Sequence, residues 1–196
     1  MNVEQRFLNI TALPNDTDEM RIEGYAVVYD EPAKHTFGEY TFTEVIKRGA
    51  LDNTDLSDVI LRYNHNDTWC IMARTKNNSL KLIKEQKGLK IQANLINTQS
   101  NRDIYKAIQS GLIDKMSFSF VVSEKGDSWS TTKNQTDREI TNIEKLSDVS
   151  VVDTPFYDTT TVYARNIEKL KQMLQQNKNI ILRKKKLLLL YGNWFC

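Results

Sequence analysis

The chain contains two histidines, and histidine is the side chain best suited to accept and return a proton near neutral pH. His65 follows a short apolar run, whereas His35 lies among loop residues and is expected at the surface. A hydrolytic triad also needs a hydroxyl nucleophile and a carboxylate that orients the imidazole, in any order along the chain. Ser117 and Asp148 are candidates for these roles. The pattern alone does not select them, because a lone serine or aspartate on a strand is more often a surface residue.

Other kinds of site find little support in the sequence. Two histidines and two cysteines, Cys70 and Cys196, lack the close spacing of zinc ligands, and no glycine-rich phosphate loop is present. We therefore expect neither a metal nor a cofactor. Two cysteines do not form a disulfide framework and are more typical of a reducing cytoplasm. We expect no signal peptide and no membrane span, because the longest apolar run, 187–191, is far shorter than the roughly 20 residues of a membrane helix.

The elements that would position these residues are mostly strands. A helix is predicted after Thr98 or Ser100, either of which can cap it, and it ends near Gly111. Residues 123–138 are polar without periodicity, which predicts a mobile loop. Runs rich in β-branched and aromatic residues predict strands at 20–29, 38–46, 59–63, 71–75, 80–85, 89–95, 112–122, 147–155 and 160–164.

Two of these strands carry candidate residues on one face. In 112–122, alternation puts Ser117 and Ser119 opposite an apolar face. In 147–155, Asp148 and Ser150 share a face in the same way. Both strands are therefore expected to bury one side and to present polar groups on the other. The apolar face of the first strand consists of Met116, Phe118, Phe120 and Val122.

The charge distribution divides the chain at about residue 164. The net charge is only +2, but residues 165–196 contain eight basic residues and one acidic residue, so the preceding part is acidic. Apolar residues at 167, 170, 174 and 181 recur near helical spacing. We expect one domain at 1–164 and a basic, partly helical tail at 165–196. The tail could bind a partner or pack on its own domain, and the acidic body argues against specific nucleic-acid binding.

Several short motifs, taken together and in order, resemble the tailed-bacteriophage prohead maturation protease family. The resemblance covers about residues 20–164, and its specificity comes from the order of the motifs. They are Gly24-Tyr-Ala-Val-Val-Tyr29, the 39–51 stretch ending Arg48-Gly-Ala-Leu51, Leu61-Arg-Tyr-Asn-His65, Gly88-Leu89, Ser110-Gly-Leu-Ile-Asp-Lys-Met-Ser-Phe-Ser-Phe120 and Asp148-Val-Ser-Val-Val-Asp-Thr-Pro155.

The resemblance implies a fold and a set of site residues. The fold would be mainly β with flanking helices (α+β), an assemblin-like closed β-barrel with a helix between the His and Ser strands. Ser117 would be the nucleophile and His65 the base. Asp148 would be the third member, where the family commonly has glutamate, with Asp153 in reserve. Ser119 stands where the family usually has glycine, and whether it assists is left open.

The resemblance also implies a function. The chain would be a serine endopeptidase that cleaves the capsid protein's scaffolding segment, or a separate scaffold protein, and itself. It would act inside the assembling prohead in the host cytoplasm, without a membrane, and a homo-oligomer is compatible with the sequence. The alternative is a non-catalytic assembly or scaffold-binding protein of the same fold. The presence of all three triad candidates favours the enzyme.

Overall fold

The computed structural model describes residues 4–13, 19–37, 40–69, 71–132 and 135–153, together with Gln175 and Leu182. Within these residues, the larger of two sheets has eight strands in the order β6-β5-β12-β9-β1-β2-β8-β7. Along the chain these are β1 (Glu4–Ala12), β2 (Met20–Val28), β5 (Ile60–Tyr63), β6 (Ala73–Arg74), β7 (Leu80–Lys84), β8 (Gly88–Leu95), β9 (Lys115–Val122) and β12 (Ile143–Val152). The predicted strand 160–164, the predicted tail helix, Cys70 and Cys196 lie outside the described residues.

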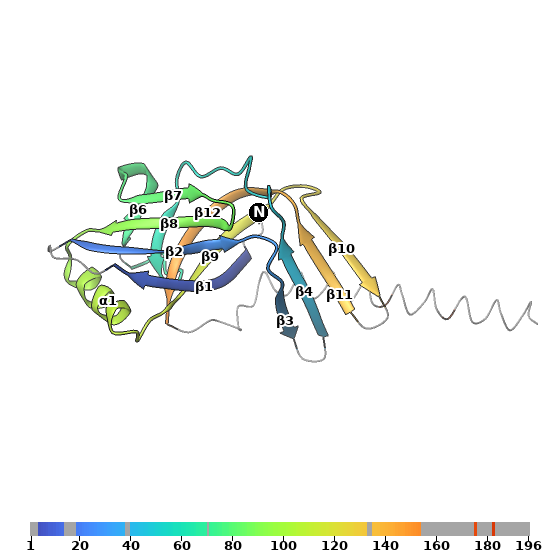
Figure 1. Cartoon of the computed structure of the whole chain (residues 1–196), viewed down its shortest axis with the longest axis horizontal. Coiled ribbons are helices and arrows are strands. Elements are labelled where there is room, and N and C mark those ends of the chain that lie inside the picture. Colours follow the sequence, from blue (N-terminus) through green and yellow to red (C-terminus); the bar gives the residue numbers. More distant parts are fainter. Residues whose placement is uncertain are drawn as a thin grey trace, which may run out of the picture.

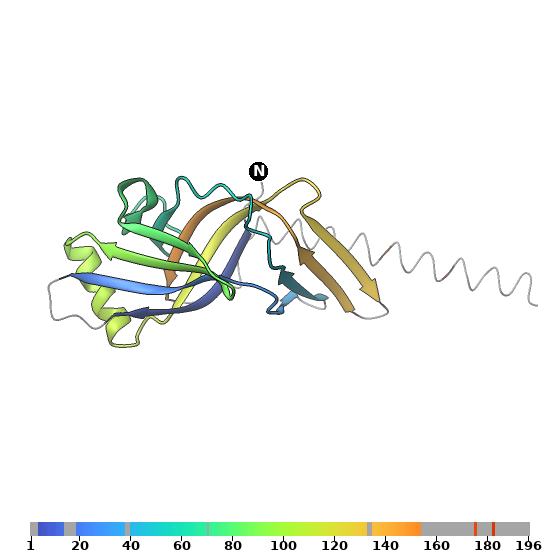
Figure 2. The same ribbon diagram turned by 45° about the horizontal axis from the view of Figure 1, so that its top comes forward.

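The eight strands curl into a nearly closed barrel (Figures 1 and 2). Its two edge strands, β6 and β7, do not pair with each other in a ladder. They are connected by residues 75–79, which include a short 3₁₀ helix, Thr75–Asn77. The Arg74 backbone N–H donates to Ser79 Oγ at 2.9 Å across this seam. The predicted mainly-β barrel is thus confirmed.

The barrel interior is filled by alternate residues of its strands. On β9, Met116, Phe118 and Phe120 are fully buried, and the rings of Phe118 and Phe120 stack with centroids 5.2 Å apart. The predicted apolar face of this strand is therefore the core face. The opposite face is not open to solvent, because Ser117 and Ser119 are also buried. They are not the surface hydroxyls that an isolated strand serine usually provides.

One α-helix, α1 (Gln99–Gln109), lies in the described part of the chain between β5, which leads to His65, and β9, which carries Ser117. Its N-cap is Thr98, whose hydroxyl accepts a hydrogen bond from the Asn101 N–H at 3.3 Å. Ile104 and Ile108 are buried on its inner side. Gly111 has φ +72°, the left-handed conformation that favours glycine after a helix. The helix is as predicted from the sequence.

A second sheet of four strands projects beside the barrel, in the order β10-β11-β4-β3 (Figure 1). Its strands are β3 (Ala33–Phe37), β4 (Tyr40–Ile46), β10 (Asp127–Thr132) and β11 (Gln135–Ile140). The prediction of a mobile loop at 123–138 is wrong, because much of this segment forms the β10–β11 hairpin. The inward residues of β11 include Thr136 and Arg138, which are polar although buried. Hydrophobic alternation therefore could not reveal this strand, and β1 was not recognised either.

Arg138 is the charged centre of this second sheet. Its guanidinium donates to Glu44 Oε2 at 2.7 Å and to Asp127 Oδ2 at 2.8 Å, and the side chains of Arg138 and Glu44 are almost completely buried. The guanidinium also lies over the ring of Trp129, 5.3 Å from its centroid. The sheet is therefore organised around a buried ion pair.

Replacing Arg138 with methionine is expected to destabilise the protein strongly. The substitution removes the guanidinium that pairs with the buried Glu44 carboxylate, and the loss of one partner of a buried ion pair typically costs about 3–5 kcal/mol. Urea unfolding followed by circular dichroism would measure the loss. Glu139→Gln, a change of charge at the exposed neighbour, is the matched control and should stay within about 0.5 kcal/mol of the wild type. Equal stability of the two variants would show that the ion pair does not support the sheet.

Candidate active site

Three neighbouring strands, β5, β12 and β9, build the candidate site. In the antiparallel β9–β12 ladder, Ser117 lies opposite Ser150 and Ser119 lies opposite Asp148. Residues directly opposite each other in a ladder point to the same side of the sheet. These four polar side chains therefore share the face that looks away from the barrel core.

His65 reaches this face through a tight turn at the end of β5. The Asn66 N–H donates to the Tyr63 carbonyl at 3.1 Å, and the two residues between them, Asn64 and His65, have φ values of 52° and 53°. Positive φ at both central positions is the pattern of a type I′ turn, which Asn and His tolerate better than most residues. The His65 N–H then donates to Ser150 Oγ at 3.1 Å, which ties the turn to β12.

The structure brings together the three residues expected to form the triad. His65 Nε2 lies 2.8 Å from Ser117 Oγ. On the other side of the ring, Nδ1 lies 2.8 Å from Asp148 Oδ1 and 3.1 Å from Oδ2. The histidine and aspartate side chains are only 14% and 12% exposed, and Ser117 is fully buried. The imidazole thus bridges a hydroxyl and a carboxylate that come from different strands.

The reserve carboxylate, Asp153, has a different setting just after β12. It accepts a hydrogen bond from the Tyr63 hydroxyl at 2.8 Å. Burial, together with this bond, raises the pKa of the Tyr63 phenol, so the phenol remains a donor to Asp153. Asp153 is therefore placed to secure the end of β5, whereas Asp148 is the carboxylate hydrogen-bonded to His65 Nδ1.

Arg62 supports the site in a way that the sequence did not reveal. Its Nε lies 3.9 Å from Asp148 Oδ2, and its Nη1 donates to the Asn66 carbonyl at 3.1 Å. It thus places a positive charge near the aspartate and holds the turn that carries His65. The sequence signal available for Arg62 is the alternation of faces along the strand. In the β5–β12 ladder Arg62 pairs with Ser150, so its side chain lies on the same side of the sheet.

The donor and acceptor capacities of the groups determine what this arrangement can do. An ionised carboxylate only accepts hydrogen bonds, so Asp148 favours the imidazole form with the proton on Nδ1. Nε2 is then free to accept the Ser117 proton, as a general base must.

Among the described residues, no group of three or more His, Cys, Asp or Glu side chains could hold a metal. Nor is any helix in that part of the chain long and apolar enough to cross a membrane.

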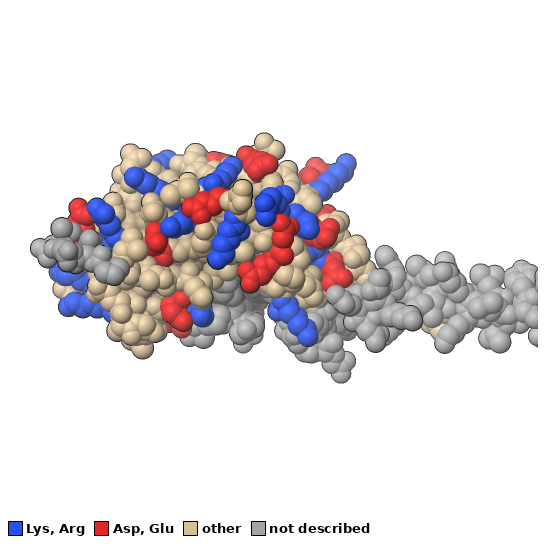
Figure 3. Space-filling model, in the orientation of Figure 1, with Lys and Arg blue, Asp and Glu red and all other residues tan. Residues whose placement is uncertain are grey.

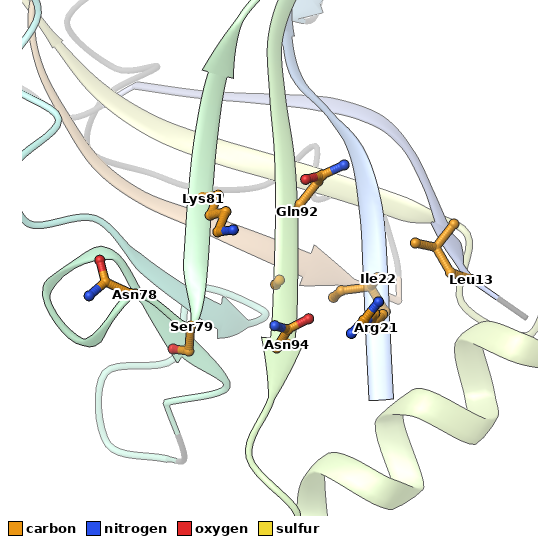
Figure 4. A pocket seen from close by; sticks show the side chains of 9 residues that line it. Leu13, Arg21, Ile22, Asn78, Ser79, Lys81, Gln92 and Asn94 are labelled. Carbon is orange, nitrogen blue, oxygen red and sulfur yellow. The ribbon is translucent and has the colours of Figure 1, made fainter. Parts of the chain in front are cut away.

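His35 and a surface hollow are associated with strands other than β5, β9 and β12, which build the candidate active site. His35 is on β3 in the second sheet, and its side chain is outside the described part. A hollow of about 210 Å³ lies over β2, β7 and β8, strands that carry none of the triad candidates. Figure 4 shows polar side chains around it, including those of Arg21, Lys81 and Gln92. The hollow is therefore not part of the candidate active site.

A barrel that sets serine, histidine and aspartate side chains in this order has the geometry of a serine hydrolase site. The family model described as Caudovirus prohead serine protease matches residues 8–175. The chain therefore belongs to the Caudovirus prohead serine protease family, a family of serine proteases of phage capsid assembly, as the motifs indicated.

Among solved structures, the chain is similar to the bacteriophage T4 capsid assembly protease, gp21, with 9% sequence identity and a TM-score of 0.45. The match covers 78% of this chain and 99% of that one. No curated protein matches the chain.

Proposed function

We propose that this chain is a serine endopeptidase with Ser117 as nucleophile, His65 as general base and Asp148 as the residue that orients the imidazole. The observation that carries the proposal is the continuous contact from Ser117 Oγ through the His65 ring to the Asp148 carboxylate, with 2.8 Å at each step. Membership of a serine protease family supports the same assignment. The rival, a non-catalytic assembly protein, would not require this contact.

The proposed reaction has two halves. Ser117 Oγ attacks the scissile carbonyl carbon while its proton moves to His65 Nε2, and the imidazolium then gives that proton to the leaving amine. The C–N bond breaks and an acyl-enzyme remains. In the second half, water gives a proton to Nε2 and attacks the ester carbon. The C–O bond to Ser117 then breaks while the imidazolium returns its proton to Oγ, which releases the carboxylic acid and restores Ser117. Asp148 stays ionised and stabilises the imidazolium in both halves. No cofactor takes part.

The proposed substrates are the capsid protein's scaffolding segment or a separate scaffold protein, and the protease itself, inside the prohead. Family membership supports this choice. The face shown in Figure 3 gives no support for nucleic acid as a specific partner. Figure 3 shows basic and acidic side chains interspersed over the described part of one face, without a large area of a single sign. Specific nucleic-acid binding typically uses a continuous basic surface.

A fluorophosphonate probe tests the proposal directly, because it reacts covalently with an activated serine. The purified chain would be labelled, digested and analysed by mass spectrometry, with His65→Ala as a variant that lacks the base. We expect one modified residue, Ser117, and a large loss of labelling in the variant. A folded wild-type chain that takes up no label, or carries it on another serine, would contradict the proposal.

We also propose that residues 1–164 form the protease domain and that residues 165–196 form a tail that delivers it to the prohead. The support is the concentration of basic residues and helically spaced apolar residues after position 164. A chain truncated near Arg165 should fold and cleave a peptide but no longer enter proheads, as assayed by co-purification. Aggregation of the truncated chain, or a much lower melting temperature, would instead assign the tail a structural role.

A further inference from the structure

We propose that Ser119 is a positioning residue for His65, acting as a second hydrogen-bond partner of Nδ1 beside Asp148. The inference rests on the proposed roles of Ser117, His65 and Asp148. It assigns a task to a hydroxyl that stands two residues from the nucleophile, on the same face of β9. The supporting observations are the crowding of oxygens around one nitrogen, the burial of Ser119 and the limited set of partners open to its hydroxyl.

Four oxygens lie within hydrogen-bond distance of His65 Nδ1. Two belong to Asp148, at 2.8 and 3.1 Å. The others are Ser119 Oγ at 3.0 Å and Ser150 Oγ at 3.2 Å. A ring nitrogen offers either one proton or one lone pair. Because the carboxylate can only accept, Nδ1 carries the proton, and each hydroxyl is placed as an additional acceptor around the same N–H.

The two hydroxyls differ in what else they do. Ser150 Oγ also accepts the backbone N–H of His65 at 3.1 Å, so it fixes the turn independently of the ring. For Ser119 Oγ, the hydrogen bond found among the described residues is the one to Nδ1. Ser119 is only 3% exposed, so bulk water has little access to its hydroxyl. Within the described part of the chain, the imidazole is therefore the hydrogen-bond partner that accounts for this buried hydroxyl.

This arrangement limits rotation of the ring. If the imidazole swings about its bond to Cβ, Nε2 leaves Ser117 and the Nδ1–H leaves its acceptors at the same time. Acceptors held by two different strands, β9 and β12, oppose such a swing, and they continue to do so after the ring has gained a proton. Ser119 therefore supports the orientation that Asp148 sets. It does not replace Asp148, because a hydroxyl can also donate to Nδ1 and so favour the wrong tautomer.

The kinetic test compares Ser119→Ala with Ser123→Ala. Ser123→Ala is a matched control because it makes the same chemical change just beyond the end of β9. The Ser123 hydroxyl donates to the Asn142 carbonyl at 3.0 Å. Ser119→Ala should lower kcat on a peptide substrate about tenfold, the scale of one hydrogen bond, with KM within about twofold. Ser123→Ala should leave both constants near wild type. In an Asp148→Asn background, Ser119→Ala should lower kcat by less than about twofold. The carboxylate that imposes the Nδ1-protonated tautomer is then absent, so Ser119 no longer has that tautomer to support.

A spectroscopic test separates positioning from a merely structural role. With only two histidines in the chain, ¹⁵N-histidine labelling of a His35→Ala variant reports His65 alone. We expect the ¹⁵N shifts of the parent to show Nδ1 protonated, and Ser119→Ala to show a mixture of tautomers or loss of the downfield Nδ1–H proton signal. Ser123→Ala should leave the spectrum unchanged. Ser119→Gly should reproduce the result if the alanine variant folds poorly.

The outcomes distinguish this inference from the proposed function. If Ser117 is labelled by the fluorophosphonate probe but Ser119→Ala keeps both its kcat and its His65 spectrum, Ser119 is not a positioning residue and the triad stands. A lower kcat with an unchanged spectrum would also overturn the inference, because it indicates a structural effect. If the wild-type chain takes up no label at Ser117, the failure belongs to the proposed function.

Discussion

Replacement of Ser117 by alanine should abolish self-processing and cleavage of capsid or scaffold protein, with a rate loss of at least about 10³-fold. The expected loss is large because the hydroxyl is the group that forms the covalent intermediate. Its Oγ lies 2.8 Å from His65 Nε2, within reach of the base. Gel electrophoresis and mass spectrometry of the products, after incubation with the capsid protein, would measure the effect.

The fold of the Ser117→Ala variant should remain intact. Ser117 points away from the core residues Met116 and Phe118, so the substitution removes one oxygen and leaves the barrel packing unchanged. A melting temperature within a few degrees of the wild type would show this. Ser119→Ala serves as the comparison, because it deletes a hydroxyl from the same face of the same strand. If Ser119→Ala were inactive and Ser117→Ala cut normally, the nucleophile would be Ser119.

Much of the scaffold could be predicted from the sequence because it is governed by local patterns. The alternation on β9 separated Ser117 from the apolar core, and Thr98 and Gly111 marked the two ends of α1. Each of these signals acts within a few residues. The nearly closed barrel followed from the family resemblance, since no local pattern specifies how eight strands are ordered.

The contacts of the site are non-local, and this is where sequence patterns were insufficient. Asp148 lies opposite Ser119 only because the β9–β12 register shifts between Leu146 and Asp148, and a shift of one residue reverses the face of every side chain that follows. His65 meets β9 only because two consecutive residues adopt positive φ. Neither feature leaves a distinctive periodicity. Arg62 was overlooked because an arginine on a strand is ordinarily a surface residue.

The second sheet also has a feature that sequence patterns do not reveal, namely a buried face made partly of polar residues. Its buried face includes Glu44 and Arg138, which form an ion pair, and Thr136, whose hydroxyl is hydrogen-bonded to that of Thr131. A pattern search based on hydrophobic residues scores such a face as exposed, and it therefore predicts a loop at 123–138. Which polar residues are buried depends on where their partners lie in the folded chain, and that information is absent from a single strand.

The second large effect is expected at the two other triad positions. His65→Ala removes the only base within 2.8 Å of Ser117 Oγ among the described residues, and activity should fall by several orders of magnitude. Asp148→Asn keeps the shape of the side chain but lets an amide N–H donate to Nδ1. That contact favours the tautomer with the proton on Nε2, which cannot accept the serine proton. We expect a loss of about 10³-fold or more, no greater than that of His65→Ala.

His35→Ala is the matched control for this series, since it makes the same substitution at the other histidine, on β3, and should be near neutral. The loss in Asp148→Asn should appear in kcat, because the carboxylate acts on the base and not on the peptide. Single-turnover kinetics would separate the chemical step from substrate binding. Asp153→Asn should keep most of the activity, because Asp153 holds Tyr63 at the end of β5. If Asp153→Asn were as impaired as Asp148→Asn is expected to be, and Asp148→Asn were active, the carboxylate of the triad would be Asp153.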